Sequence, residues 1–141
     1  MTENDFRVKY CELMEYYQYL EMRLKFICAA LLADEEKGWF ERLYDYDSDP
    51  FGLLLQKIKE YQKQKNNPML SQDDFAALDE IRQKRNYWAH QCFGGLNPIV
   101  FNRGQLRRAE YGNLLISDLN EAIEWDKQLT EISSNNDIEF K

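Results

Sequence analysis

The chain has 141 residues, of which 44% are hydrophobic and 14% aromatic, so we expect one folded domain with a buried core rather than a disordered chain. Twenty-five acidic residues against 18 basic ones leave a formal net charge of -7, which argues against a uniformly basic nucleic-acid coat and a polybasic membrane-surface protein. No apolar run approaches the roughly 18 residues of a membrane span, and the acidic, polar N-terminus is unlike a signal peptide. We therefore expect a soluble, cytoplasmic protein.

The first half of the chain predicts three helical segments. A long helix is predicted from Asp5 to about Leu32, because apolar residues recur there at steps of three or four and neither Gly nor Pro intervenes. One or two helical turns are expected around Trp39–Tyr44, before an acidic loop over residues 45–50. That loop imitates the start of a calcium site, but it lacks the turn glycine and the bidentate Glu, so we expect no EF-hand. The next helix is predicted from about Pro50 to Gln64.

The second half predicts two more helices. One begins at the N-cap Ser71, with carboxylates in its first turn, and runs to about Phe93, where Gly94-Gly95 ends it. Residues 96–102 are expected to form a loop or a short extended piece. The last helix is predicted to begin near Gly104 and to run towards Leu129. Period-two alternation is sustained nowhere, so no sheet is expected.

Together these elements predict an all-α fold, an antiparallel bundle of four main helices plus a short helix. A single domain is expected over residues 1–132, followed by a flexible tail over residues 133–141. We expect three tryptophans in the core, Trp39, Trp88 and Trp125. Three cysteines without a CxxC pair and one histidine do not make up a zinc site in one protomer. The thiols are therefore expected to be reduced and packed as small hydrophobes, and neither a metal nor a cofactor is expected.

The charge is distributed unevenly along the chain. Residues 81–109 contain no Asp or Glu and six basic residues, whereas the rest of the chain holds twelve basic and twenty-five acidic ones. A local field of this kind can focus a polyanion, but the same cations could be solvated or pair with the acidic first and last helices. The basic residues of this acid-free window are Arg82, Lys84, Arg85, Arg103, Arg107 and Arg108.

Arg85 interrupts the apolar stripe of the third long helix. At 100° per residue this stripe comprises Leu78, Ile81, Trp88, Ala89 and Cys92. A guanidinium in such a stripe needs compensation. It could pair with an intramolecular carboxylate, extend to the surface, or face an anion at an interface or cleft. Asn86 and His90 lie one helical turn apart on an adjacent face, so the three polar side chains surround the last two turns.

The segment Arg85-Asn86-Tyr87-Trp88-Ala89-His90 resembles the signature of the HEPN superfamily (higher eukaryotes and prokaryotes nucleotide-binding domains). The family pattern is Arg, a polar residue, three variable residues and His, near the end of the third long helix of a small helical domain. The resemblance implies a homodimer in which two copies of the motif face each other across a cleft. It also implies a metal-independent endoribonuclease of toxin–antitoxin, antiphage or CRISPR-associated systems.

On this resemblance Arg85 and His90 are the catalytic candidates, and Asn86 is their supporting polar residue. Cys92 stands where a subset of such toxins carries the Tyr that a partner antitoxin nucleotidylates, so this mode of regulation is not expected. An antitoxin or inhibitor protein remains a partner that the resemblance implies.

The chemistry can also be argued from the residue types. Cleavage of RNA through its own 2′-hydroxyl needs a base, an acid and a cation, and His and Arg suit these roles. One chain offers a single histidine, whereas a two-fold dimer supplies two. The remaining window cations are candidates for binding RNA phosphates: Arg82, Lys84, Arg103, Arg107 and Arg108. The alternative is a non-catalytic HEPN-like helical module that binds a nucleotide, RNA or a protein partner.

Overall fold

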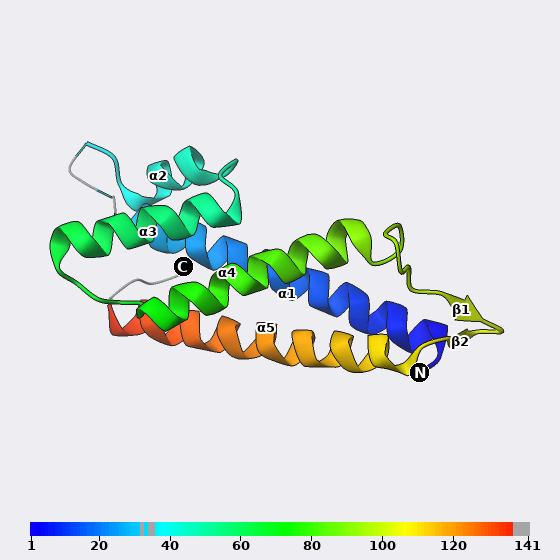
Figure 1. Ribbon diagram of the computed structural model, residues 1–141. Helices are drawn as coiled ribbons and strands as arrows, with labels where there is room; N and C mark the ends of the chain where they lie inside the picture. Colours follow the sequence, from blue (N-terminus) through cyan, green and yellow to red (C-terminus); the bar gives the residue numbers. More distant parts are fainter. Residues whose placement is uncertain (32, 34–35, 137–141) are drawn as a thin grey trace.

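The computed structural model describes residues 1–31, 33 and 36–136, apart from the side chain of Trp39, and it is mostly helical (Figure 1). Within these residues the α-helices are α1 (Glu3–Leu31), α2 (Trp39–Tyr46), α3 (Phe51–Lys65), α4 (Gln72–Asn86) and α5 (Ala109–Asn135). A π-helical turn, η1 (Tyr87–Gln91), continues α4, and two short strands, β1 (Phe101–Asn102) and β2 (Gln105–Leu106), precede α5. The predicted helical fold is thus confirmed, whereas the prediction for the side chain of Trp39 lies outside the described residues.

The two longest helices, α1 and α5, pack side by side and run in the same direction (Figure 1). Thr2 forms a β-bridge with Gln105 just before the two helices begin, and Arg23 pairs with Asp126 in their later halves at 2.8 Å between Nε and Oδ1. An antiparallel bundle of four main helices was expected, in which the first and the last helix would run in opposite directions. That part of the prediction is wrong, because α1 and α5 are parallel. The physical reason is α2, because this short helix adds one reversal of the chain between them. α2 and α4 run against both long helices, and α3 runs with them (Figure 1).

One core holds the helices together. Trp88 is fully buried and Trp125 is 8% exposed, as predicted. Side chains of this size contribute about 1.5–3 kcal/mol each when they leave water. The buried face of α1 shares five residues with the predicted stripe, whereas Tyr10 and Leu31 of that stripe are only partly buried. This face comprises Phe6, Leu13, Tyr17, Leu20, Leu24, Ile27, Cys28 and Ala29. None of the described helices is long and apolar enough to cross a bilayer.

The start of α4 is set by local chemistry. The Ser71 hydroxyl accepts a hydrogen bond from the N–H of Asp74 at 3.0 Å, and the Asp74 carboxylate accepts one from the N–H of Ser71 at 2.9 Å. This reciprocal capping box satisfies two amides that the helix leaves unpaired. The predicted N-cap is therefore confirmed.

A small hairpin occupies the stretch where the last helix was expected to begin. Arg103 and Gly104 have positive φ angles of 52° and 74°, the combination that a tight two-residue hairpin requires. The N–H of Leu106 donates to the carbonyl of Met1 at 2.9 Å, so the hairpin is also fixed to the N-terminus. The prediction that the chain forms no sheet is therefore wrong, because β1 and β2 pair in this hairpin. The predicted start of the last helix near Gly104 is also wrong, since α5 begins only at Ala109.

The C-terminal end of α5 is longer than expected. The helix continues to Asn135, into the segment predicted as a flexible tail from residue 133. Ser133 is fully buried, and its hydroxyl donates to the carbonyl of Leu129 at 2.7 Å. Packing of this last turn explains why its polar sequence still forms a helix. The expectation for residues 137–141 lies outside the described part of the chain.

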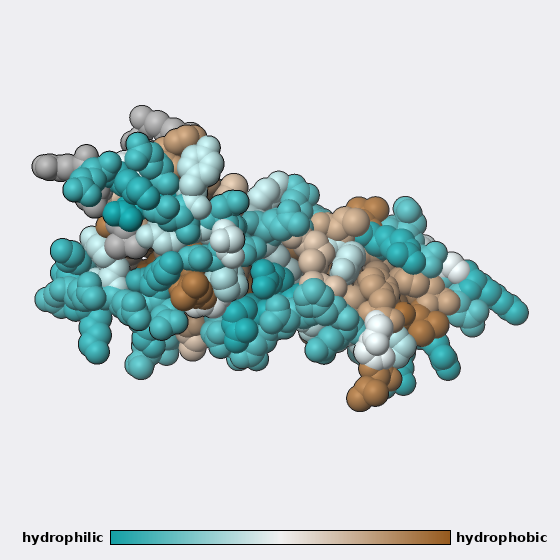
Figure 2. Space-filling model, turned by 90° about the horizontal axis from the view of Figure 1, so that it is seen from above, coloured by the Kyte–Doolittle hydropathy of each residue, from teal (hydrophilic) through white to brown (hydrophobic). Residues whose placement is uncertain are grey.

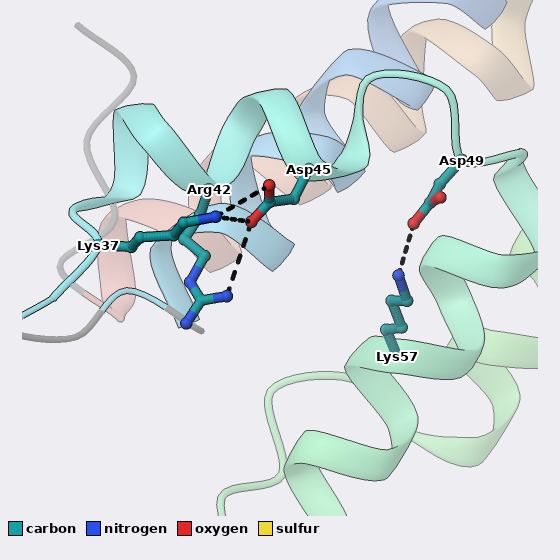
Figure 3. A network of polar contacts seen from close by, with 5 residues as sticks. All are labelled: Lys37, Arg42, Asp45, Asp49 and Lys57. Carbon is teal, nitrogen blue, oxygen red and sulfur yellow. Dashed lines mark hydrogen bonds and ion pairs between the residues drawn. The ribbon is translucent and has the colours of Figure 1, made fainter.

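The acidic loop between α2 and α3 is held by cations (Figure 3). Asp45 pairs with Lys37 at 3.3 Å and with Arg42 at 3.6 Å, and Asp49 pairs with Lys57 at 2.6 Å. The hydrogen bond to Asp49 is the main cause that raises the pKa of Lys57. Lysine and arginine side chains thus pair with Asp45 and Asp49, two of the carboxylates that imitate a calcium loop.

Candidate functional site

The Arg85–His90 segment lies where α4 changes into the π-turn η1. The N–H of Cys92 donates to the carbonyl of Tyr87 at 3.0 Å, one residue further back than in an α-helix. Such a turn inserts an extra residue, and isolated π-turns occur frequently at functional sites. The sequence pattern predicted an uninterrupted helix to Phe93, so this change of geometry was missed.

Trp88 anchors the π-turn. Its indole Nε1 donates to Oδ2 of Asp118 on α5 at 2.8 Å, and this carboxylate is only 4% exposed. The carbonyl of Trp88 accepts hydrogen bonds from the Tyr10 hydroxyl at 2.8 Å and from Sγ of Cys92 at 3.1 Å. The side chains of Tyr10 and Cys92 thus satisfy this carbonyl, whose usual α-helical donor, the N–H of Cys92, donates instead to the carbonyl of Tyr87.

Arg85 has an intramolecular carboxylate partner. Its Nη1 lies 3.4 Å from Oε2 of Glu21 on α1, and its Nη2 lies 3.4 Å from Oδ1 of Asn86. The guanidinium also lies 5.9 Å from the centre of the Phe51 ring on α3. The side chain of Arg85 is 26% exposed. Both polar distances are at the long end for hydrogen bonds, so this guanidinium is held weakly and is accessible.

His90 lies apart from this pair. Its side chain is exposed, and no hydrogen bond or ion pair connects it to another residue in the described part of the chain. The structure therefore brings Arg85 and Asn86 together but does not join them to His90 within one chain. Ala89 was expected on the buried stripe and is instead exposed, within the π-turn η1 where the α-helical spacing no longer holds.

The predicted phosphate-binding cations on α4 are already neutralised. Arg82 pairs with Asp79 at 2.8 Å, and this hydrogen bond holds the pKa of Asp79 below its ordinary value. Lys84 pairs with Glu121 of α5 at 2.9 Å and lies 3.7 Å from Asp118. Residues 81–109 contain no acidic residue, but the fold brings carboxylates next to them. These are Asp79, from the preceding turn of α4, and Asp118 and Glu121, from α5.

The other three predicted cations, Arg103, Arg107 and Arg108, remain exposed. Arg103 occupies the tip of the hairpin, and Arg107 and Arg108 lie between β2 and α5. No ion pair joins them to a carboxylate within residues 1–31, 33 and 36–136. The unpaired positive charge of the window is therefore concentrated at the hairpin end of the molecule.

A groove runs between the loop after η1 and the start of α5. A cavity of about 360 Å³ lies beside η1, and one of about 200 Å³ lies beside the hairpin. Both are lined by Leu96, Asn97 and Tyr111. The first is also lined by Tyr87, Gln91 and Gly95, and the second by Pro98, Val100, Arg107 and Arg108. Sequence reasoning missed this groove, because it forms only where the loop after η1 folds against the start of α5.

Apolar surface surrounds the groove. Figure 2 shows apolar side chains gathered at the end of the molecule that carries the hairpin. Leu96 is fully exposed, Phe93 is 42% exposed and Val100 is 40% exposed. Contiguous apolar surface of this kind commonly marks a binding region.

Comparisons with models of protein families, with curated proteins and with solved structures find no match for this chain. The functional assignment therefore depends on the motif, the groove and the charges described above.

Proposed function

We propose that the chain is a metal-independent endoribonuclease of the HEPN type that acts as a homodimer, in the role of a toxin or antiphage effector. The observation that carries this proposal is the Arg85-Asn86-His90 set at the π-turn. Asn86 contacts the Arg85 guanidinium, and the His90 imidazole is open to solvent. Two groups of the required chemistry thus lie at one accessible end of α4.

The reaction assigns one role to each side chain. The imidazole of one His90 accepts the proton of the ribose 2′-hydroxyl while the 2′-oxygen bonds to phosphorus. The bond from phosphorus to the 5′-oxygen breaks, and a second imidazole gives this oxygen its proton, which leaves a 2′,3′-cyclic phosphate and a 5′-hydroxyl. The Arg85 guanidinium binds the phosphate oxygens as their negative charge grows, and Asn86 orients it.

A second copy of the chain supplies what one copy lacks. One protomer has a single histidine, and its Arg85 and His90 side chains are not in contact. A two-fold axis near the end of α4 would bring the His90 of each protomer towards the Arg85 of the other. The small exposed side chain of Ala89 and the partly exposed ring of Phe93 support an interface here.

The cations divide into two groups in this proposal. Arg107 and Arg108 are exposed beside the groove and are placed to bind RNA phosphates. Arg85 has to exchange Glu21 for a phosphate, which the long 3.4 Å contact favours. Arg82 and Lys84 would likewise have to leave their carboxylate partners.

The test is RNA cleavage by the purified protein in the presence of EDTA. We expect the unmodified protein to cut single-stranded RNA and His90→Ala or Arg85→Ala to lose about a hundredfold or more of the rate. Lys63→Ala is the matched control, since it removes an exposed cation from the last turn of α3. Phe93→Glu should abolish both the dimer, measured by light scattering, and cleavage. Full activity of His90→Ala, or of an enforced monomer, would contradict the proposal.

A non-catalytic HEPN-like binding module is the second candidate. It is favoured by the contacts of Arg85, whose guanidinium already has Glu21 and Asn86 as structural partners. This candidate predicts intact RNA at high protein concentration, together with a loss of stability or of dimerisation in Arg85→Ala. The same set of variants therefore separates the two functions.

A further inference from the structure

The groove beside η1 has an aromatic lining of suitable size for a planar ligand. Tyr87 and Tyr111 both line its larger part, which holds about 360 Å³. Small-molecule sites commonly occupy about 300–1,000 Å³. The Tyr111 hydroxyl donates to the carbonyl of Asn97 at 2.9 Å, which fixes the position of the ring. An aromatic ring held in this way offers a face on which a nucleobase can stack.

The smaller part of the groove is cationic. Arg107 and Arg108 line it, both are exposed, and neither pairs with a carboxylate of the described residues. The N–H of Arg107 donates to the carbonyl of Val100 at 3.0 Å, so the backbone that carries these arginines is fixed. Guanidinium groups bind phosphate through two parallel hydrogen bonds. The charge of this part of the groove is therefore complementary to a phosphate.

The groove adjoins the motif. Gln91 lines its larger part and directly follows His90 in η1. The N–H of Gly95 donates to the carbonyl of Gln91 at 2.8 Å, and a Cβ at Gly95 would lie 2.7 Å from that oxygen. Glycine is thus required for the loop to close this tightly on η1. The amide of Gln91 offers both a donor and an acceptor to the edge of a base.

From these observations we infer that the groove is a subsite for one unpaired nucleotide of an RNA strand. Its base stacks on Tyr111 and Tyr87, and its phosphate binds to Arg107 and Arg108. The inference rests on the proposed function, because it places this nucleotide next to the phosphate that is cut at His90. Proteins commonly hold single strands in this way, with aromatic side chains for the bases and a positively charged groove for the backbone. A duplex keeps its bases stacked inside, so it cannot occupy the subsite.

The test measures binding of short, fluorescently labelled single-stranded RNA by anisotropy. All variants carry His90→Ala, so that the RNA stays intact. We expect Arg107→Ala with Arg108→Ala to weaken binding at least tenfold and to reduce its dependence on salt. Tyr111→Leu should weaken binding about tenfold, whereas Tyr111→Phe, which keeps the ring but loses the hydrogen bond to Asn97, should weaken it less. Lys63→Ala with Lys65→Ala is the matched control, because it also removes two exposed cations and these lysines of the last turn of α3 line neither part of the groove.

Three results would overturn the inference. The first is unchanged RNA affinity in the variant that lacks Arg107 and Arg108, and the second is equally tight binding of duplex RNA. The third is loss of the RNA-free dimer in that variant, which would make the groove an interface between copies.

The two proposals fail separately. If the groove variants bind RNA normally and the unmodified protein cuts it, the subsite is wrong and the ribonuclease proposal stands. If the unmodified protein leaves RNA intact while binding depends on Tyr111 and the two arginines, the subsite stands and the ribonuclease proposal is wrong.

Discussion

Asp118 is the buried group that ties the motif-bearing π-turn to α5, and Asp118→Ala tests this role. Its Oδ2 accepts the indole N–H of Trp88 at 2.8 Å, and Trp88 is fully buried. The substitution leaves the indole N–H of a fully buried side chain without its acceptor. Lys84, whose side chain is 34% exposed, keeps Glu121 as its partner, so its loss is small.

The magnitude follows from these contacts. A hydrogen bond to a charged group contributes about 1.5–3 kcal/mol, and an unsatisfied buried donor costs about 1–3 kcal/mol. Release of the carboxylate from its buried position offsets part of this loss. We therefore expect Asp118→Ala to lower the free energy of unfolding by about 2–3 kcal/mol. At about 4 °C per kcal/mol for a domain of this size, the melting temperature should fall by about 8–12 °C.

Urea unfolding followed by circular dichroism measures this change. Glu121→Ala is the control, because it removes an ion pair that is about one-third exposed and should cost less than about 1 kcal/mol. Trp88→Phe removes the donor, and the double variant should show a coupling energy of about 1–3 kcal/mol. An Asp118→Ala protein as stable as Glu121→Ala, or a double variant without coupling, would refute the assigned role.

Three further outcomes follow from local contacts. Ser71→Ala should lower the free energy of unfolding by about 1 kcal/mol in the same urea experiment, because it removes the N-cap of α4. Burial raises the pKa of the Cys28 thiol to about 12. Iodoacetamide at mildly alkaline pH should therefore modify the exposed Cys11 and leave Cys28 unmodified until urea unfolds the chain. Peptide mass spectrometry measures both modifications. Arg82 lowers the pKa of Asp79, so the stability from this pair is present above the ordinary pKa of aspartate and is lost as the pH falls through the lowered value. Asp79→Asn should therefore be slightly less stable than the unmodified protein at neutral pH, by less than about 1 kcal/mol because Asp79 is about half exposed, and the difference should vanish at acid pH. Equal urea midpoints at neutral pH, or a more stable Asp79→Asn, would contradict this.

The helices and several of their ends were determined by the sequence itself. The stripe of α1 and the capping box of Ser71 and Asp74 depend on residues within one or two turns of each other, so their pattern is legible along the chain. The Arg85-Asn86-His90 motif was also visible in this way. The hairpin turn at Arg103-Gly104 was missed, because its two-residue strands are too short for any alternation to show.

The direction of the helices, the π-turn and the pairing of charges were decided by tertiary structure alone. Trp88 and its partners Asp118 and Tyr10 are 30 and 78 residues apart in the chain, and Arg85 is 64 residues from Glu21. Electrostatic and packing energies depend on distance in space, not on separation along the chain. An acid-free stretch of sequence can therefore be neutralised by helices that fold against it, whereas its three arginines at the hairpin end have no carboxylate partner among the described residues.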